Sequence, residues 1–172
     1  MVIKYFIASI SILFFISCAH PSYKIEANKD GEPLLNPLLY TLNEKLTDED
    51  FKIIDTLSFY IESFEGLDSN EDQRANPVIY KFHANGYFKQ DSFLYYGKFD
   101  KVRTKNSAYY GGKYDINGNT IIFESFYPIS GNNERKFSKV ISRGVIEKDT
   151  IIIDFFGTTH KYIRKSYSEI FN

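Results

Sequence analysis

The feature that most constrains the fold is a series of short segments in which apolar and polar residues alternate, separated by turn sequences. Alternation with a period of two places every second side chain on one face of a β-strand. Asn85-Gly86, Asn117-Gly118 and Lys148-Asp149 lie between such segments, and Asn-Gly is a strong hairpin signal. Neighbouring segments are therefore predicted to pair as antiparallel strands in chain order.

The turns also predict a register for the hairpins, because residues that pair on one face should match in polarity. A two-residue turn at Asn117-Gly118 pairs Tyr114 with Ile121, which places apolar beside apolar. The same test at Lys148-Asp149, again with a two-residue turn, pairs Ile146 with Ile151. We predict both registers.

The hairpin at Asn85-Gly86 requires a different loop. A two-residue turn would pair Phe82 with Lys89 and mix the two faces of the sheet. A three-residue loop with a left-handed Gly86 pairs Phe82 with Phe88 instead. The second register is the predicted one.

Applied along the chain, the pattern predicts nine strands, and Thr47-Asp48-Glu49-Asp50 predicts a short preceding helix that ends near Ile54. The strands are expected near 56–64, 77–83, 86–91, 93–99, 109–116, 119–127, 137–147, 150–156 and 160–164. Their inner face is expected to hold Leu57, Phe59, Ile61, Val78, Tyr80, Phe82, Phe88, Tyr110, Tyr114, Ile116, Ile121, Phe123, Val140, Ile146, Ile151, Ile153 and Phe155. Lys139, Arg143, Glu147 and Asp154 are expected to face water.

Closure into a barrel is the expected architecture, because no long helix is predicted to cover the sheet edges. Gly111-Gly112 and Gly144, inside predicted strands, favour the strong coiling that closure requires. The predicted fold class is all-β, an antiparallel up-and-down barrel of about eight strands with a short N-terminal helix. A β-sandwich is the alternative.

The first residues have the pattern of a processing signal. Lys4 is followed by an apolar run from Tyr5 to Ile16, and Ser17 precedes Cys18. The run is too short to cross about 30 Å of hydrocarbon comfortably. The segment resembles the lipobox that signal peptidase II recognises, which implies lipidation of Cys18 and a membrane anchor. An ordinary secretory signal is the alternative.

The predicted domains are a signal peptide at 1–17, a polar tether at 18–45 and a barrel domain at 46–172. Cys18 is the single cysteine, which leaves no thiol for a disulfide or a cysteine metal site. A formal net charge of −1, with scattered basic residues, argues against a nucleic-acid partner. No cofactor is expected, and the protein is expected to be a monomer.

Four phrases of the barrel domain carry a family resemblance: "IIDTLSFYI", "YKFHANGYF", "GGKYDINGNTIIFE" and "VISRGVIEKDTIIIDF". With the lipobox leader, they resemble the lipocalin-like lipoproteins of Bacteroidota-type cell envelopes over Ile53 to Arg164. The resemblance implies a lipocalin-like barrel. The chain departs from true lipocalins in having no tryptophan, and hence no Gly-x-Trp motif on the first strand. Because Ala19 follows the cysteine, resemblance also implies the outer membrane, with the domain facing the periplasm.

No catalytic motif is found, and the expected function is not enzymatic. His20, His83 and His160 are not spaced as metal ligands, Ser130-Gly131 lacks the Gly-x-Ser-x-Gly elbow, and no calcium or phosphate loop is present. No metal site is predicted.

Two functions follow from an interior rich in aromatic residues. A hollow barrel would bind a small hydrophobic molecule, with Tyr80, Tyr110 and Tyr114 as polar contacts in an apolar pocket. A barrel filled by its own side chains would instead be a structural or protein-interaction scaffold, with contacts from loops such as 66–76 and 130–135. We expect the first, and the sequence leaves both open.

Overall fold

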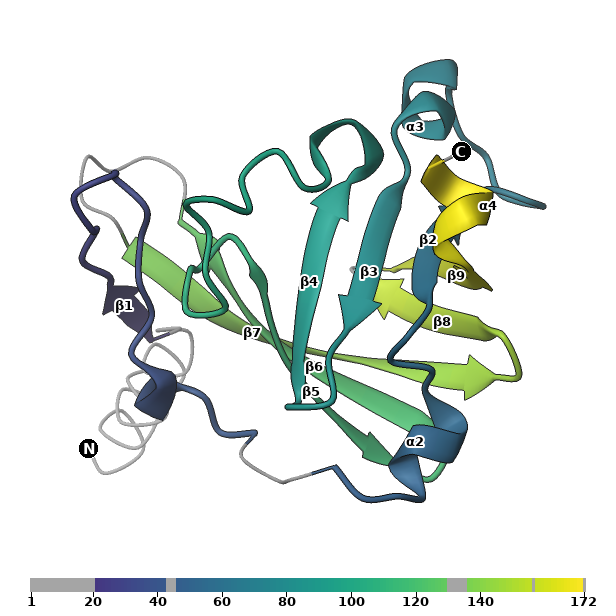
Figure 1. The fold of residues 1–172 in the computed structure, drawn as a ribbon, viewed down its shortest axis with the longest axis horizontal. Coiled ribbons are helices and arrows are strands. Elements are labelled where there is room, and N and C mark those ends of the chain that lie inside the picture. The colour runs from purple at the N-terminus through teal and green to yellow at the C-terminus, as the bar shows by residue number, and fades with distance from the viewer. Residues whose placement is uncertain (1–20, 43–45, 130–135, 156, 172) are drawn as a thin grey trace, which may run out of the picture.

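Eight strands pair in chain order and the last pairs with the first, which closes an antiparallel barrel (Figure 1). The computed structural model describes residues 21–42, 46–129, 136–155 and 157–171. The predicted fold class, an all-β up-and-down barrel with a short N-terminal helix, is confirmed. The barrel strands are β2 (Phe59–Ser63), β3 (Val78–Phe82), β4 (Tyr87–Ser92), β5 (Gly111–Asn117), β6 (Thr120–Pro128), β7 (Lys136–Glu147), β8 (Thr150–Phe155) and β9 (Thr158–Lys165).

Two hairpin registers are as predicted. Phe82 pairs with Phe88 across a three-residue loop, in which Gly86 has a φ of 77°. Ile146 pairs with Ile151 across a two-residue loop, in which Lys148 has a φ of 54°. In both hairpins the polarity match between the strands therefore selected the correct loop length.

The β5–β6 register differs from the prediction. The loop is Gly118-Asn119, so that Ile121 pairs with Ile116, and Tyr114 pairs with Phe123. Gly118, at the first loop position, has a φ of 59°, as a type II′ hairpin prefers. The pairing moves by two residues, so every side chain keeps its predicted face.

The structure has a short helix and turns where one strand was predicted, and it has further short helices that were not predicted. Residues 93–99 form a 3₁₀ turn, η2 (Phe93–Tyr95), and further turns, with Gly97 at a φ of 78° that breaks an extended strand. The predicted first helix is α2 (Asp50–Ile53). Three further helices were not predicted: η1 (Pro37–Leu39), α3 (Glu71–Ala75) and α4 (Tyr167–Phe171). No helix in the described part of the chain is long and apolar enough to cross a membrane.

Residues 21–42 belong to the fold, contrary to the predicted polar tether. Within them, β1 (Ser22–Lys24) pairs with the first residues of β7, and the segment lies along the outer face of the barrel (Figure 1). It encloses a second apolar core between itself and that face. This core consists of Ile25, Leu35, Tyr40, Tyr87, Ala108, Phe126 and Phe137.

A buried carboxylate fixes this segment to the barrel. Glu124 on β6 is fully buried and accepts hydrogen bonds from the Thr41 amide at 2.8 Å and the Leu42 amide at 2.8 Å. Lys139 on β7 forms an ion pair with Glu124 at 2.7 Å. Lys139 was predicted to face water, and that prediction is wrong because residues 21–42 cover it.

Inside the barrel, one end is filled by side chains. This end carries the β3–β4, β5–β6 and β7–β8 hairpins, and α2 lies beside it (Figure 1). The central core cluster is formed by Leu46, Ile54, Tyr60, Tyr80, Phe82, Phe88, Tyr114, Ile116, Ile121, Phe123, Ile146, Ile151, Ile153 and Tyr162.

The predicted phase of β2 is reversed. Tyr60 is 1% exposed and belongs to the core, whereas Leu57 is 87% exposed. Phe59 faces outward but is still buried, because its ring packs 5.7 Å from that of Phe171 on α4. Both faces of β2 are therefore covered by aromatic packing, and apolar residues do not mark the inside of this strand.

Candidate ligand-binding site

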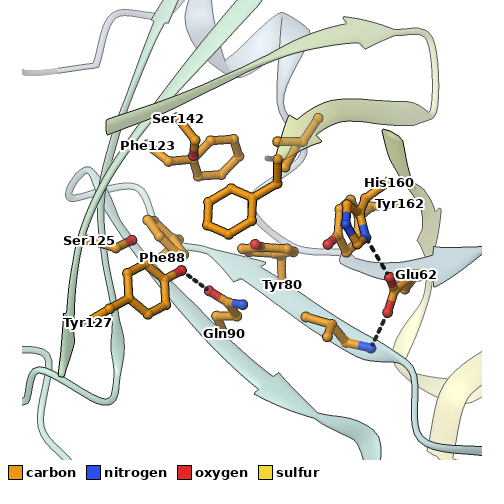
Figure 2. A pocket seen from close by; sticks show the side chains of 13 residues that line it. Glu62, Tyr80, Phe88, Gln90, Phe123, Ser125, Tyr127, Ser142, His160 and Tyr162 are labelled. Carbon is orange, nitrogen blue, oxygen red and sulfur yellow. Dashed lines mark hydrogen bonds and ion pairs between the residues drawn. The ribbon is translucent and has the colours of Figure 1, made fainter. Parts of the chain in front are cut away.

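The opposite end of the barrel is hollow. A cavity of about 150 Å³ lies there and is partly open to the outside (Figure 2). We call this cavity the cup. It is lined by Glu62, Val78, Tyr80, Phe88, Gln90, Phe123, Ser125, Tyr127, Ser142, Ile153, Phe155, His160 and Tyr162.

Aromatic rings form much of the wall of the cup. The rings of Tyr80 and Tyr162 meet at 88° with centroids 4.8 Å apart, and those of Phe88 and Phe123 meet at 88° at 5.3 Å. Edge-to-face contacts of this kind hold each ring in place. The cup is therefore a preformed site with fixed walls.

A carboxylate and an imidazole stand together at one side of the cup (Figure 2). Glu62 on β2 lies 2.9 Å from His160 Nδ1 on β9, and it accepts the Val78 amide hydrogen at 3.1 Å. The Glu62 side chain is 11% exposed, and that of His160 is 31% exposed. No hydrogen bond to His160 Nε2 is found among the described residues. The pair thus supplies a fixed negative group and an unbonded ring nitrogen.

Polar side chains on other strands complete the cup. Tyr127 donates a long hydrogen bond of 3.5 Å to Gln90 Oε1 across the rim. Burial raises the pKa of Tyr80 well above its usual value. Burial raises the pKa of Tyr162 as well. Both hydroxyls therefore stay protonated over the ordinary pH range and act as hydrogen-bond donors or acceptors, without charge.

Of the three tyrosines predicted to contact a ligand, one lines the cup. Tyr80 does so. Tyr114 lies in the filled end, where its hydroxyl donates to the His83 carbonyl at 2.9 Å. The Tyr110 hydroxyl lies 2.8 Å from His83 Nε2, and the two rings stack. Tyr110 and Tyr114 are therefore not among the residues that line the cup.

Tyr110 was misplaced because the strand does not continue through it. The adjacent Gly111, the first residue of β5, has a φ of 153°, a backbone conformation that residues with a side chain rarely adopt. A Cβ at that position would lie 2.3 Å from the Phe88 carbonyl oxygen, so only glycine allows β4 and β5 to approach here. The consecutive glycines Gly111 and Gly112 were the sequence signal that regular strand geometry is interrupted next to Tyr110.

The sequence reasoning missed Glu62 and His160 as site residues. The predicted phase of β2, with Phe59 and Ile61 inside, implies the outer face for Glu62, and no second histidine lies at ligand spacing from His160 in the sequence. Gln90 and Ser142, by contrast, were on the predicted inner face, since they share the phase of Phe88 and Ile146. Polar residues at inward positions near strand ends were the signal for an open cup.

The described residues contain no cluster of three or more histidine, cysteine, aspartate or glutamate side chains that could hold a metal ion. Cys18 and His20 lie outside the described residues. No protein-family model, curated protein or solved structure matches the chain.

Proposed function

We propose that this chain is a non-catalytic, lipid-anchored protein of the cell envelope that binds a small hydrophobic molecule in its β-barrel. The observation that supports binding is the cup, which has a rigid aromatic wall and a few convergent polar groups. That combination is typical of small-molecule sites in proteins. The filled end gives the cup a solid floor.

The volume of the cup limits the ligand. The cavity measures about 150 Å³, and an apolar cavity of about that size holds one benzene ring. Sites for larger ligands measure about 300 Å³ or more. The ligand is therefore a single ring or a short branched chain, rather than a long fatty acid.

Filling the cup should weaken binding. Ser142→Leu places a branched side chain in the cavity, and we expect the Kd for toluene, measured by calorimetry, to rise at least about tenfold. Arg143→Leu introduces the same side chain at the next, outward-facing position and should leave the Kd unchanged. Equal affinity in the wild type and Ser142→Leu would contradict binding in the cup, and no saturable binding in the wild type would favour the scaffold function.

The anchor is tested separately, because it depends on Cys18. We expect Cys18→Ser to abolish labelling by a fatty-acid probe and to move the protein from the detergent phase to the aqueous phase. A lipid chain contributes about 0.8 kcal/mol per buried CH₂, so the shift in partition should be nearly complete. Ser17→Thr, which keeps the cysteine, serves as a comparison. Unchanged partition of Cys18→Ser would exclude the lipid anchor.

A further inference from the structure

The ionisable side chains around the cup are unbalanced in charge. Glu62 contributes a carboxylate, and among the described residues that line the cup there is no lysine or arginine. The other ionisable lining groups are the imidazole of His160, which faces Glu62 from β9, and tyrosine hydroxyls on β3, β6 and β9. His160 offsets the charge of Glu62 only when its imidazole is protonated, and a carboxylate that is mostly removed from water is costly without a positive partner. The cup therefore favours a positive charge over a negative one.

The aromatic rings act in the same direction. Six rings line the cup: Tyr80, Phe88, Phe123, Tyr127, Phe155 and Tyr162. The face of an aromatic ring is electron-rich and attracts a cation, most strongly where water is excluded. The basic side chains that do contact rings lie elsewhere: Lys81, for example, lies over Phe59, which is outside the barrel. Among the described residues, no basic side chain lies over the rings of Tyr80, Phe88, Phe123, Tyr127 or Tyr162.

We propose that the ligand of the cup is a small organic cation, an ammonium group that carries alkyl substituents. Its alkyl groups contact the rings, and its charge faces Glu62, which His160 and the Val78 amide hold in place. Alkylated ammonium groups are the cations that cages of aromatic side chains recognise. This inference rests on the proposed function, since it specifies the ligand class of the same cup.

Three probes of one shape test the charge. Choline is a cation, 3,3-dimethylbutan-1-ol replaces its nitrogen with carbon, and 3,3-dimethylbutanoate has the same branched end with a carboxylate. By calorimetry at neutral pH and constant ionic strength, we expect choline to bind the intact protein at least about tenfold more tightly than the alcohol. The carboxylate should bind most weakly.

The variants separate charge from shape. Glu62→Gln keeps the size of the side chain and should weaken choline binding by about tenfold while leaving the alcohol unaffected. Tyr127→Leu removes a ring at the exposed rim and should also reduce the preference for choline. Glu65→Gln removes the same charge from an exposed position three residues later and should change neither Kd. Circular dichroism checks that each variant folds.

Three results would overturn the inference. If the alcohol or the carboxylate binds at least as tightly as choline, or if Glu62→Gln leaves choline binding unchanged, the ligand is not a cation, and the proposed binding function stands on its own. If choline, the alcohol and toluene all fail to bind saturably, both the ligand class and the binding function are wrong.

Discussion

Glu124→Ala is expected to lower the free energy of unfolding by about 3–5 kcal/mol, the cost of breaking a buried ion pair by removing one partner. The substitution leaves Lys139 without its carboxylate and the amides of Thr41 and Leu42 without an acceptor. Urea unfolding measures the loss. Faster hydrogen exchange at the two amides would show that residues 21–42 detach. Glu147→Ala, at an exposed position, should change stability by less than about 0.5 kcal/mol.

The buried carboxylate of Glu124 also predicts that the free energy of unfolding depends on pH. Burial alone would raise the pKa of Glu124, but hydrogen bonds from Lys139, Leu42 and Thr41 outweigh burial and lower the pKa below its usual 4.5. A depressed folded-state pKa means that the stabilisation is complete above the usual value and is lost as the pH falls through the folded value. Glu124→Gln should lack this acid-side loss. A wild type and a Glu124→Gln variant with parallel pH profiles would contradict the role of the ion pair.

Ile151→Asp should be more damaging still, because it places an unpaired carboxylate in the filled end of the barrel. Ile151 is 1% exposed and pairs with Ile146 and Tyr162. Losing a buried isoleucine and burying a charge together cost more than about 4 kcal/mol. We expect little folded protein by circular dichroism.

The adjacent residue supplies the matched control. Ile152→Asp introduces the same charge one position later on β8, on the outward face, where the residue pairs with Lys161. Its cost should be about 1 kcal/mol. If denaturant midpoints ranked Ile152→Asp as the more damaging variant, the inner and outer faces of the barrel would be reversed.

For strands that have one face in contact with water, the inward face and the register were predictable from the sequence. β7 and β8 alternate clearly near their hairpin, so polarity fixed both face and register there. β2 does not, because Phe59 is covered from outside by α4 and Tyr60 is buried inside. With both faces apolar, alternation carries no information about which side is the interior. Because the predicted faces of β2 are the reverse of those in the structure, the sequence did not indicate Glu62 as a residue of the cup.

The fold of residues 21–42 could not be predicted from local pattern. Their apolar residues have no regular period, and turns separate them. Their order depends on a distant partner, since Thr41 bonds to Glu124 across 83 residues of chain. A carboxylate in the middle of an apolar strand, with Phe123 before it and Phe126 after it, was the one signal that another segment must cover this face.

The central claim is that a small molecule binds at the open end of the barrel, and the most direct measurement is the location of bound toluene by intermolecular NOEs. The account predicts NOEs from the probe to the ring protons of Phe88 and Phe123, which line the cup. It predicts none to Tyr114, which lies in the filled end. NOEs to Tyr114 or to the outer surface, or none at saturating probe, would contradict it.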